Sequence, residues 1–263
     1  HPSTPSSAAS DVYKRQIVPS LVIFAGWKSA SIYIGFFTVI LGFVLMPFQS
    51  AIDDDRQPQR KISFRGVSHP LRMVMSYRPL RRLAVISFLY AGMQLCLFTY
   101  LVIYLKDDVG MAFIAAGLTL SAAQMSGTIG RVLWGFLADH YIRPHKLLGF
   151  LGIGMSLGAV ATALIENSWP LAAVLLVTII FGATAIGWNG VYLAEAARRA
   201  PKGEVGAATG GTLFFTYFGV VLGPPIFGGV VSTSGSYPLA FLFFSCLTLI
   251  GGVLILMTRI KQQ

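Results

Sequence analysis

The sequence predicts an all-α integral membrane protein, built as a bundle of apolar helices. The first observation behind this prediction is composition, because 55% of the 263 residues are hydrophobic, only 11% are charged and the mean hydropathy is +0.70. Soluble domains contain roughly 45–50% apolar residues. The second observation is a series of apolar runs of about 20 residues, the length of helix that crosses a hydrocarbon core of about 30 Å. Each run should be helical, since a backbone in lipid must satisfy its own hydrogen bonds.

Seven such runs define the expected spans in chain order. They cover residues 29–48, 83–105, 112–137, 147–166, 170–194, 207–231 and 237–258. A shorter run, IVPSLVIFA at residues 17–25, would extend only about 14 Å as a helix. We therefore expect this run to be a stub, the last turns of a span whose beginning is missing from the sequence.

The first sixteen residues, HPSTPSSAASDVYKRQ, differ in character from everything that follows. They are polar and lack the apolar core of a signal peptide. They resemble a translated adaptor joined to the end of an assembled sequence, and the alternative is a disordered cytoplasmic tail. Residues 1–16 are therefore treated as a non-native or disordered tail outside the fold.

Positive charge is concentrated on one side of the expected bundle, and the net charge of the chain is +10. The opposite side carries only Lys28 and Lys106. By the positive-inside rule the basic side, with the C-terminus, is cytoplasmic. Since the basic residues are strung between spans, no nucleic-acid partner is expected. The basic side carries Arg56, Arg60, Lys61, Arg65, Arg72, Arg78, Arg81, Arg82, Arg143, Lys146, Arg198, Arg199, Lys202, Arg259 and Lys261.

The polar loop at residues 49–82 separates one span from the following six. Its second half, SFRGVSHPLRMVMSYRPLRR, has an amphipathic, basic pattern. Such a segment can lie on an anionic leaflet, with membrane lipid as its partner. The alternative is a solvated linker that fixes the topology.

Polar side chains in the middle of a span are costly in lipid, so they are the candidate solute-binding residues. Gln94 and Gln124 lie at the middle of two successive spans, with Tyr90 one turn from Gln94. The alternative for the two glutamines is a hydrogen bond that joins their helices. Ser121, Thr128 and Arg131 lie three, four and seven positions from Gln124, so the four residues form a polar stripe on one helix face. The complete candidate set is Tyr90, Gln94, Ser121, Gln124, Thr128, Arg131, Thr216 and Tyr217.

Glycine and proline mark candidate packing and hinge positions. Glycines recur at intervals of four residues, at 154 and 158, 206 and 210, and 219 and 223, and small residues at this spacing let membrane helices approach closely. Gly223, Pro224 and Pro225 are expected to break a span at depth and to act as a gate, with a simple kink as the alternative.

Catalytic, cofactor and metal sites are not expected. No aspartate, glutamate or histidine falls at mid-depth in a predicted span, so the paired carboxylates or metal ligands of an enzyme are missing there. Cys96 and Cys246 each fall in the middle of a span and imply neither a disulfide nor a metal site.

Charge returns abruptly in the stretch GRVLWGFLADHYIRPHK, residues 130–146. Arg131 lies within the span, whereas Asp139 begins a short cytoplasmic loop among cations and helix ends. A carboxylate placed there can bond to backbone N–H groups or to a guanidinium. We expect a contact between helices that forms in one conformation and breaks in another.

The segment GFLADHYIRPHK resembles the glycine, aspartate and basic motif of the major facilitator superfamily, and FGATAIGWNGVYLAEAARRAPKGEVGAATGG is also similar to its bacterial members. On this resemblance Gly135, Asp139 and Arg143 match the motif and form the expected conformational motif. The sequence departs from it at three positions, which fits the weaker second copy of the motif. These positions are His140, Ile142 and Pro144.

The resemblance implies a solute transporter of the bacterial cytoplasmic membrane that works by alternating access. Residues 17–48 would be the end of an N-terminal half, 49–82 a cytoplasmic linker and 83–263 the C-terminal half. Within the last, residues 83–166 and 170–258 would form two inverted three-helix repeats. The missing N-terminal half of the same protein is then a partner, together with a small-molecule solute.

Arg131 indicates which solute to expect. A guanidinium inside the hydrocarbon edge must snorkel, pair or face a water-filled cavity, and it holds carboxylates or phosphates well. The sequence thus predicts transport of a small solute, an organic anion or a zwitterion, by symport or uniport. In the alternative, Arg131 anchors its helix to lipid headgroups or to a carbonyl. A transporter-like receptor that binds a solute without flux is a second alternative function.

Overall fold

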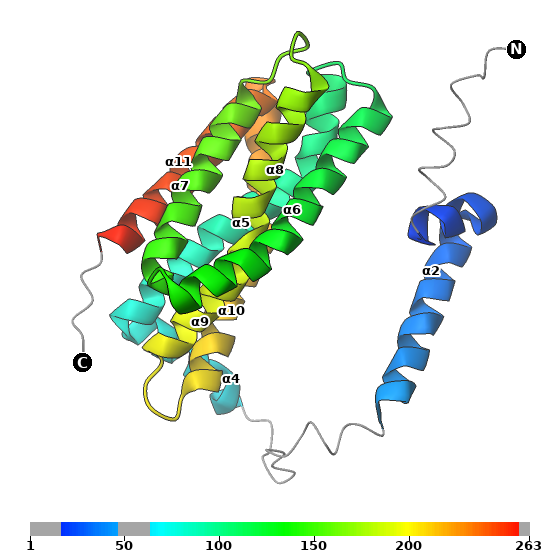
Figure 1. Cartoon of the computed structure of the whole chain (residues 1–263). Coiled ribbons are helices and arrows are strands. Elements are labelled where there is room, and N and C mark those ends of the chain that lie inside the picture. The colour runs from blue at the N-terminus through cyan, green and yellow to red at the C-terminus, as the bar shows by residue number, and fades with distance from the viewer. Residues whose placement is uncertain (1–16, 47–63, 258–263) are drawn as a thin grey trace, which may run out of the picture. The chain divides into compact units, whose positions relative to one another are not determined.

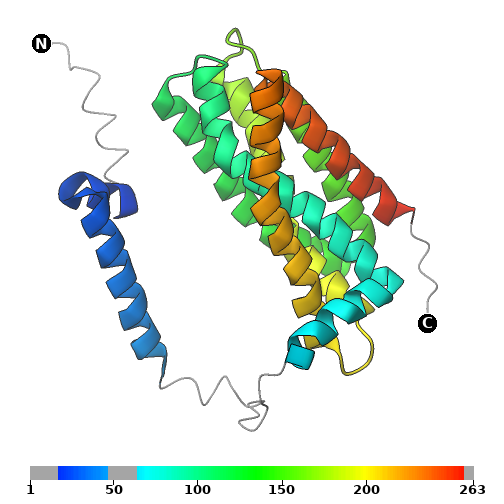
Figure 2. The same ribbon diagram turned by 180° about the vertical axis from the view of Figure 1, so that it is seen from behind.

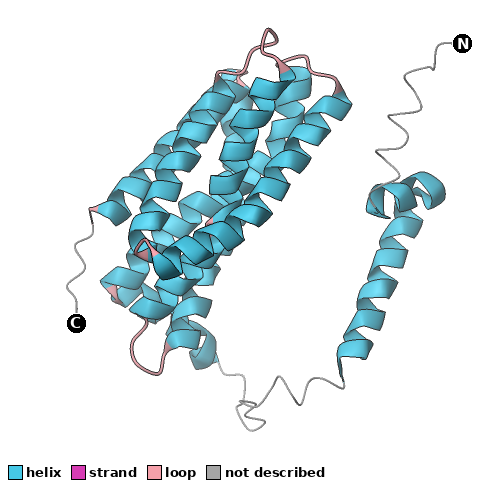
Figure 3. Cartoon of the chain, viewed as in Figure 1, coloured by secondary structure: helices cyan, strands magenta, loops and turns pink. Residues whose placement is uncertain are grey.

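The computed structural model describes residues 17–46 and 64–257, and every regular element in these ranges is a helix (Figures 1 and 3). The chain divides into two compact units, residues 1–62 and 63–263, which are described separately. The first unit contains α2, Ile17–Leu45. Gly26 interrupts this helix with a φ of 75°, a conformation that favours glycine. The interruption falls between the predicted stub and the first predicted span.

The second unit is a bundle in which helix ends coincide with turn-forming residues. Proline occupies the first or second position of α5, α7 and α11, where its missing N–H costs nothing. Gly235 ends α10 in the left-handed conformation, with φ 69°. The helices are α4 (Phe64–Ser76), α5 (Arg78–Asp107), α6 (Phe113–His140), α7 (Pro144–Ala163), α8 (Leu171–Gly187), α9 (Asn189–Arg199), α10 (Val205–Ser234) and α11 (Tyr237–Leu256).

Five spans among the described residues are long and apolar enough to cross a membrane: α5, α7, α8 with α9, α10 and α11. The predicted span at 112–137 corresponds to α6, whose 28 residues extend about 42 Å. Polar residues keep α6 out of the five, so its crossing stays a prediction. The predicted span at 29–48 is represented by a shorter apolar helix, Ser31–Leu45.

The bundle is held together by three principal helix pairs. Helix α5 packs against α10, α6 against α8, and α7 against α11. Figure 2 shows α10 crossing α5 on the side of the bundle that is hidden in Figure 1. With α8 and α9 counted as one span, the helices form two triplets, α5–α6–α7 and α8/α9–α10–α11. The first helix of each triplet packs against the second helix of the other, and the two third helices pack against each other. This pairing is unchanged when the two triplets are exchanged.

Close approach between α5 and α10 depends on glycine. A Cβ atom at Gly219 would collide with the backbone of Phe88, and one at Gly223 would meet the backbone of Gly92 at 2.7 Å. The prediction of close packing is therefore confirmed for this glycine pair. It is also confirmed for Gly154 and Gly158, where a Cβ would meet Thr184 at 2.9 Å and Phe181 at 2.8 Å. At 206 and 210 a Cβ would have no atom of the described residues within 4 Å, so close packing there stays a prediction.

The amphipathic half of the basic loop forms α4. Its apolar side packs against α10 and α5, with Val74 fully buried beside Leu80, Ala84 and Ala208. The apolar face of α4 is thus covered, at least in part, by the bundle.

The expected break at Gly223, Pro224 and Pro225 is wrong, because α10 is one continuous helix with both prolines inside it. Proline removes a backbone donor and normally bends a helix. Here the Tyr100 hydroxyl of α5 donates a hydrogen bond to the Pro224 carbonyl over 2.9 Å. Its ring also stacks on Phe227 of α10, with centroids 4.5 Å apart. Pro224 and Pro225 leave the carbonyls of Val220 and Val221 without helical donors, so the Tyr100 bond does not replace a missing rung of the ladder. It joins α10 to α5 beside the two prolines.

Candidate functional site at the junction of α8 and α9

The helical span that starts with α8 is interrupted at Trp188, which belongs to neither α8 nor α9. Near this junction the Ile186 carbonyl accepts two side-chain hydrogen bonds, from Arg131 Nε over 3.2 Å and from Asn189 Nδ2 over 3.3 Å. Carbonyls in the last turn of a helix lack intrahelical partners, and a carbonyl oxygen has two lone pairs. Side chains from α6 and α9 therefore satisfy this helix end.

Gln94 on α5 joins the same network. Its Oε1 atom accepts hydrogen bonds from Trp188 Nε1 over 3.1 Å and from Asn189 Nδ2 over 3.2 Å. We call Gln94, Arg131, Trp188, Asn189 and the Ile186 carbonyl the polar centre. It brings together three segments that are distant in the sequence.

Aromatic side chains hold Trp188 in place. The indole is fully buried and makes edge contacts with Tyr90 and Tyr192, with centroids 5.5 and 5.3 Å apart. Tyr90 is also fully buried, and its hydroxyl donates to the Leu148 carbonyl of α7 over 3.1 Å. The proposed contact between Tyr90 and a solute therefore needs correction, because Tyr90 packs behind Trp188.

The polar stripe predicted on α6 is present. Ser121, Gln124, Thr128 and Arg131 are all exposed in the bundle. The two hydroxyls bond to their own helix, Ser121 to the Gly117 carbonyl over 3.0 Å and Thr128 to the Gln124 carbonyl over 3.1 Å. No hydrogen bond between described residues joins Gln94 to Gln124, so the alternative of a glutamine pair is wrong. Gln124 and Arg131 remain the members of the stripe with polar groups available to a solute.

Thr216 and Tyr217 do not share a surface. Thr216 is buried and donates to the Thr212 carbonyl over 3.2 Å, whereas Tyr217 is 64% exposed. Consecutive helical residues point about 100° apart, because a helix has 3.6 residues per turn. Thr216 is therefore removed as a solute contact, and Tyr217 stays a candidate on the open face of α10.

The expected conformational motif lies at the α6–α7 connection. Gly135 has space around it, while Asp139 and Arg143 are exposed. Within residues 64–257, no hydrogen bond or ion pair to the Asp139 carboxylate is present. The contact expected of this motif is therefore not formed here, and a role in another conformation stays a prediction.

A buried ion pair at the end of α9 was missed by the sequence analysis. Arg199 Nη2 lies 2.6 Å from Glu195 Oε1, and the two side chains are 10% and 5% exposed. The spacing of four residues on one helix was the available signal. Its burial was not visible in the sequence, since only the fold covers this side of α9.

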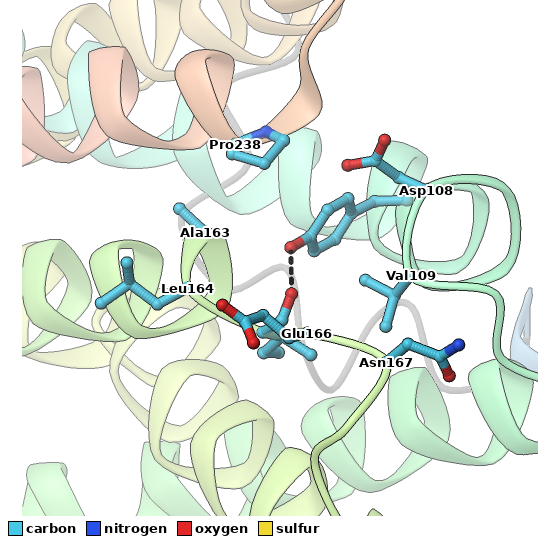
Figure 4. Close-up of a pocket in the computed structure, with 9 residues that line it drawn as sticks. Asp108, Val109, Ala163, Leu164, Glu166, Asn167 and Pro238 are labelled. Carbon is cyan, nitrogen blue, oxygen red and sulfur yellow. Dashed lines mark hydrogen bonds between the residues drawn. The ribbon is translucent and has the colours of Figure 1, made fainter.

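A pocket of about 370 Å³ lies at the opposite end of the bundle, between the end of α5, the α7–α8 loop and the start of α11 (Figure 4). Asp108, Glu166 and Tyr104 line it, and the Tyr104 hydroxyl donates to the Ile165 carbonyl over 3.1 Å. Two carboxylates at the rim disfavour an anion. Asp108 also follows Gln94 by fourteen residues, about 21 Å along a helix. This pocket is therefore separate from the polar centre.

These features define a multi-pass α-helical membrane protein with a polar centre between its spans. The sequence pattern of the Major Facilitator Superfamily matches residues 17–224, which is more than half of the chain. The chain belongs to this superfamily of membrane transporters, and not to an enzyme family.

Three curated relatives have similar sequences. Human "Monocarboxylate transporter 11" is 25% identical over 86% of this chain and 48% of its own length. "Probable galactarate/D-glucarate transporter GudP" of Escherichia coli (strain K12) is 28% identical over 62% of this chain and 38% of its own. "Probable sulfoacetate transporter SauU" of Cupriavidus necator is 27% identical over 90% of this chain and 59% of its own. The chain thus spans about half the length of these relatives.

A solved structure with the same fold is that of the Escherichia coli fucose:proton symporter FucP. It superimposes with a TM-score of 0.68 at 16% identity, covering 96% of this chain and 61% of that one. At this identity the likeness concerns the fold alone.

Proposed function

We propose that this chain is part of a longer transporter that moves a small organic anion across the membrane by alternating access. The observation that carries the proposal is the chemistry of the polar centre. Its one formal charge is the Arg131 guanidinium, and Trp188 contributes a donor that is already used by Gln94. The side-chain groups that make no hydrogen bond to a described residue are the η nitrogens of Arg131, Nε2 of Gln94 and Oδ1 of Asn189, so the positive charge of Arg131 and a majority of donors remain for a solute.

Arg131 and Gln94 provide the donors. Arg131 uses Nε for the Ile186 carbonyl, while both η nitrogens make no hydrogen bond to a described residue. Gln94 accepts two hydrogen bonds at Oε1, so its Nε2 group is the part that remains. A guanidinium binds carboxylates through paired, charge-assisted bonds.

The relatives are consistent with this class of solute. Their names specify a monocarboxylate, galactarate or D-glucarate, and sulfoacetate, all of which are organic anions. Each match covers less than two thirds of the relative's length. The class of substrate is therefore proposed from the polar centre, and the names of the relatives support it.

The packing of the bundle supports two inverted repeats, α5–α7 and α8–α11. Exchange of the triplets preserves the pairing of α5 with α10, α6 with α8 and α7 with α11. If α6 crosses the membrane, each triplet contains three crossings. Because three is odd, the second triplet begins on the side of the membrane opposite to the one where the first triplet begins. The partner in alternating access would be an N-terminal half that includes α2.

The test of the proposed function is uptake by the complete transporter in proteoliposomes, with labelled pyruvate, D-glucarate and sulfoacetate as anions. We expect saturable uptake of at least one anion and none of glycerol or L-fucose, because the donors and the charge of Arg131 favour a carboxylate. Empty liposomes are the control. Uptake confined to the neutral compounds would contradict the proposal, and saturable binding of an anion without flux would indicate a receptor.

We also propose the orientation in which Lys202 is cytoplasmic and Ser234 faces outward, in a bacterial cytoplasmic membrane. Lys202 precedes α10 and Ser234 is its last residue, and the 30 residues of the helix extend about 45 Å. In a background with Cys96 and Cys246 replaced by alanine, a cysteine at 234 should react with an impermeant thiol reagent in intact cells, and one at 202 should react only after lysis. The reverse pattern would refute this topology.

A further inference from the structure

The hydrogen bonds of Gln94 fix which end of its carboxamide is available. The indole Nε1–H of Trp188 can only donate, so the Gln94 atom 3.1 Å away must be the carbonyl oxygen. The Ile186 carbonyl can only accept, so the Asn189 atom that contacts it must be the amide nitrogen, and the same nitrogen reaches Gln94 Oε1 over 3.2 Å. Partners with a single role therefore determine both amide orientations.

We infer that Asn189 is a positioning residue that makes Gln94 a hydrogen-bond donor for the carboxylate of the solute. This inference rests on the proposed function and names a specificity determinant of the same site. Trp188 and Asn189 occupy both lone pairs of Oε1, which leaves the two N–H groups of Nε2. A Gln94 carboxamide held only by Trp188 keeps its oxygen on the indole, but it can turn about that single hydrogen bond, so Nε2 loses its fixed direction toward the carboxylate.

The position of Asn189 makes this role specific. Asn189 follows the Trp188 interruption directly, and its amide bridges Gln94 of α5 and the Ile186 carbonyl, which also holds Arg131 of α6. The Ile186 carbonyl thereby positions both groups, the Arg131 guanidinium of α6 directly and the Gln94 amide of α5 through Asn189. A carboxylate bound by both receives its two sets of donors from groups that Asn189 keeps in a fixed relation.

A double-mutant cycle tests the inference in the complete transporter, with Asn189→Ala, Gln94→Leu and the double variant. The probes are labelled pyruvate, D-glucarate and sulfoacetate. Gln94→Leu should raise the KM of a transported anion about tenfold, the effect of losing one hydrogen bond to a charged group. Asn189→Ala should raise it several-fold in the parent, with kcat little changed. In the Gln94→Leu background its effect should be clearly smaller, because the part that acts through Gln94 is lost and only the part that acts through the Ile186 carbonyl shared with Arg131 remains.

Ser126→Ala is the matched control. Ser126 also joins two helices, since its hydroxyl donates to the Ile179 carbonyl of α8 over 2.8 Å, but among the described residues it has no hydrogen bond to Gln94. Its effect on the KM should be the same in both backgrounds. If Asn189→Ala does not fold, as judged by size-exclusion chromatography, Asn189→Ser replaces it, because serine is too short to reach Gln94.

The outcomes separate the inference from the proposed function. A parent protein that transports none of the three anions would overturn the proposed function. A parent that transports an anion, with the asparagine variant raising the KM equally in both backgrounds, would overturn only the positioning role of Asn189.

Discussion

Arg131→Lys in the complete transporter is expected to raise the KM for an anionic solute at least several-fold, while the yield of folded protein stays at the parental level. The guanidinium serves two partners at once, because Nε binds the Ile186 carbonyl over 3.2 Å and the η nitrogens remain for the solute. Lysine has one compact ammonium group and cannot form the planar fork that holds a carboxylate through two parallel bonds. It can reach the carbonyl or the anion, but not both in the same geometry.

Arg81→Lys provides the matched control for this measurement. Arg81 also donates to a backbone carbonyl, from Nη1 to Met75 over 3.0 Å, but it is exposed at the start of α5 and outside the polar centre. Its replacement should leave the KM unchanged. A parental KM for Arg131→Lys would instead identify Arg131 as an anchor of α6 to α8 or to lipid headgroups. The anionic solute would then lose the charge on which its proposal depends.

Gly219→Ala is expected to prevent folding of most of the protein. The added methyl group would collide with the Phe88 carbonyl, and the neighbouring contacts are also backbone atoms of α5, which cannot move aside as a flexible side chain can. Overpacking of a core costs about 1–3 kcal/mol and more where the backbone must shift. The measurement is the fraction of monodisperse protein recovered by size-exclusion chromatography in detergent, together with the temperature of aggregation.

Gly229→Ala, on the same helix, is the control for this change. A Cβ at Gly229 has no atom within 4 Å. Alanine also favours a helix over glycine by about 1 kcal/mol, so the control should fold as well as the parent. Equal recovery of the two variants would show that α5 and α10 separate easily, and that the close approach at Gly219 does not hold the bundle together.

Local patterns predicted the helices well. Hydropathy and helix-terminating residues are properties of neighbouring positions, and they placed the spans that correspond to α5, α7, α8 with α9, α10 and α11. The superfamily that the resemblance indicated was confirmed by the match over residues 17–224. Both predictions rest on short stretches of sequence that can be interpreted without knowledge of tertiary contacts.

Errors arose where a partner on another helix decides the outcome. Two adjacent prolines predicted a break in α10, but the helix is continuous through them, with Tyr100 of α5 bonded and stacked alongside. Tyr90 and Thr216 were expected to meet a solute because they are polar and deep, yet both are buried against protein. Depth can be estimated from a hydropathy pattern, whereas the direction of a side chain relative to its neighbours cannot.

The sequence by itself determined that this chain is a helical membrane protein of a transporter superfamily, and it identified Gln94 and Arg131 as candidates. Only the tertiary structure joined them, through the Ile186 carbonyl and the Asn189 amide at the interruption of the α8–α9 span. Helix formation depends on residues within a few positions of one another. A hydrogen bond from Asn189 to Gln94, 95 residues apart, depends on how three helices pack. That packing also decides which donors remain for a solute.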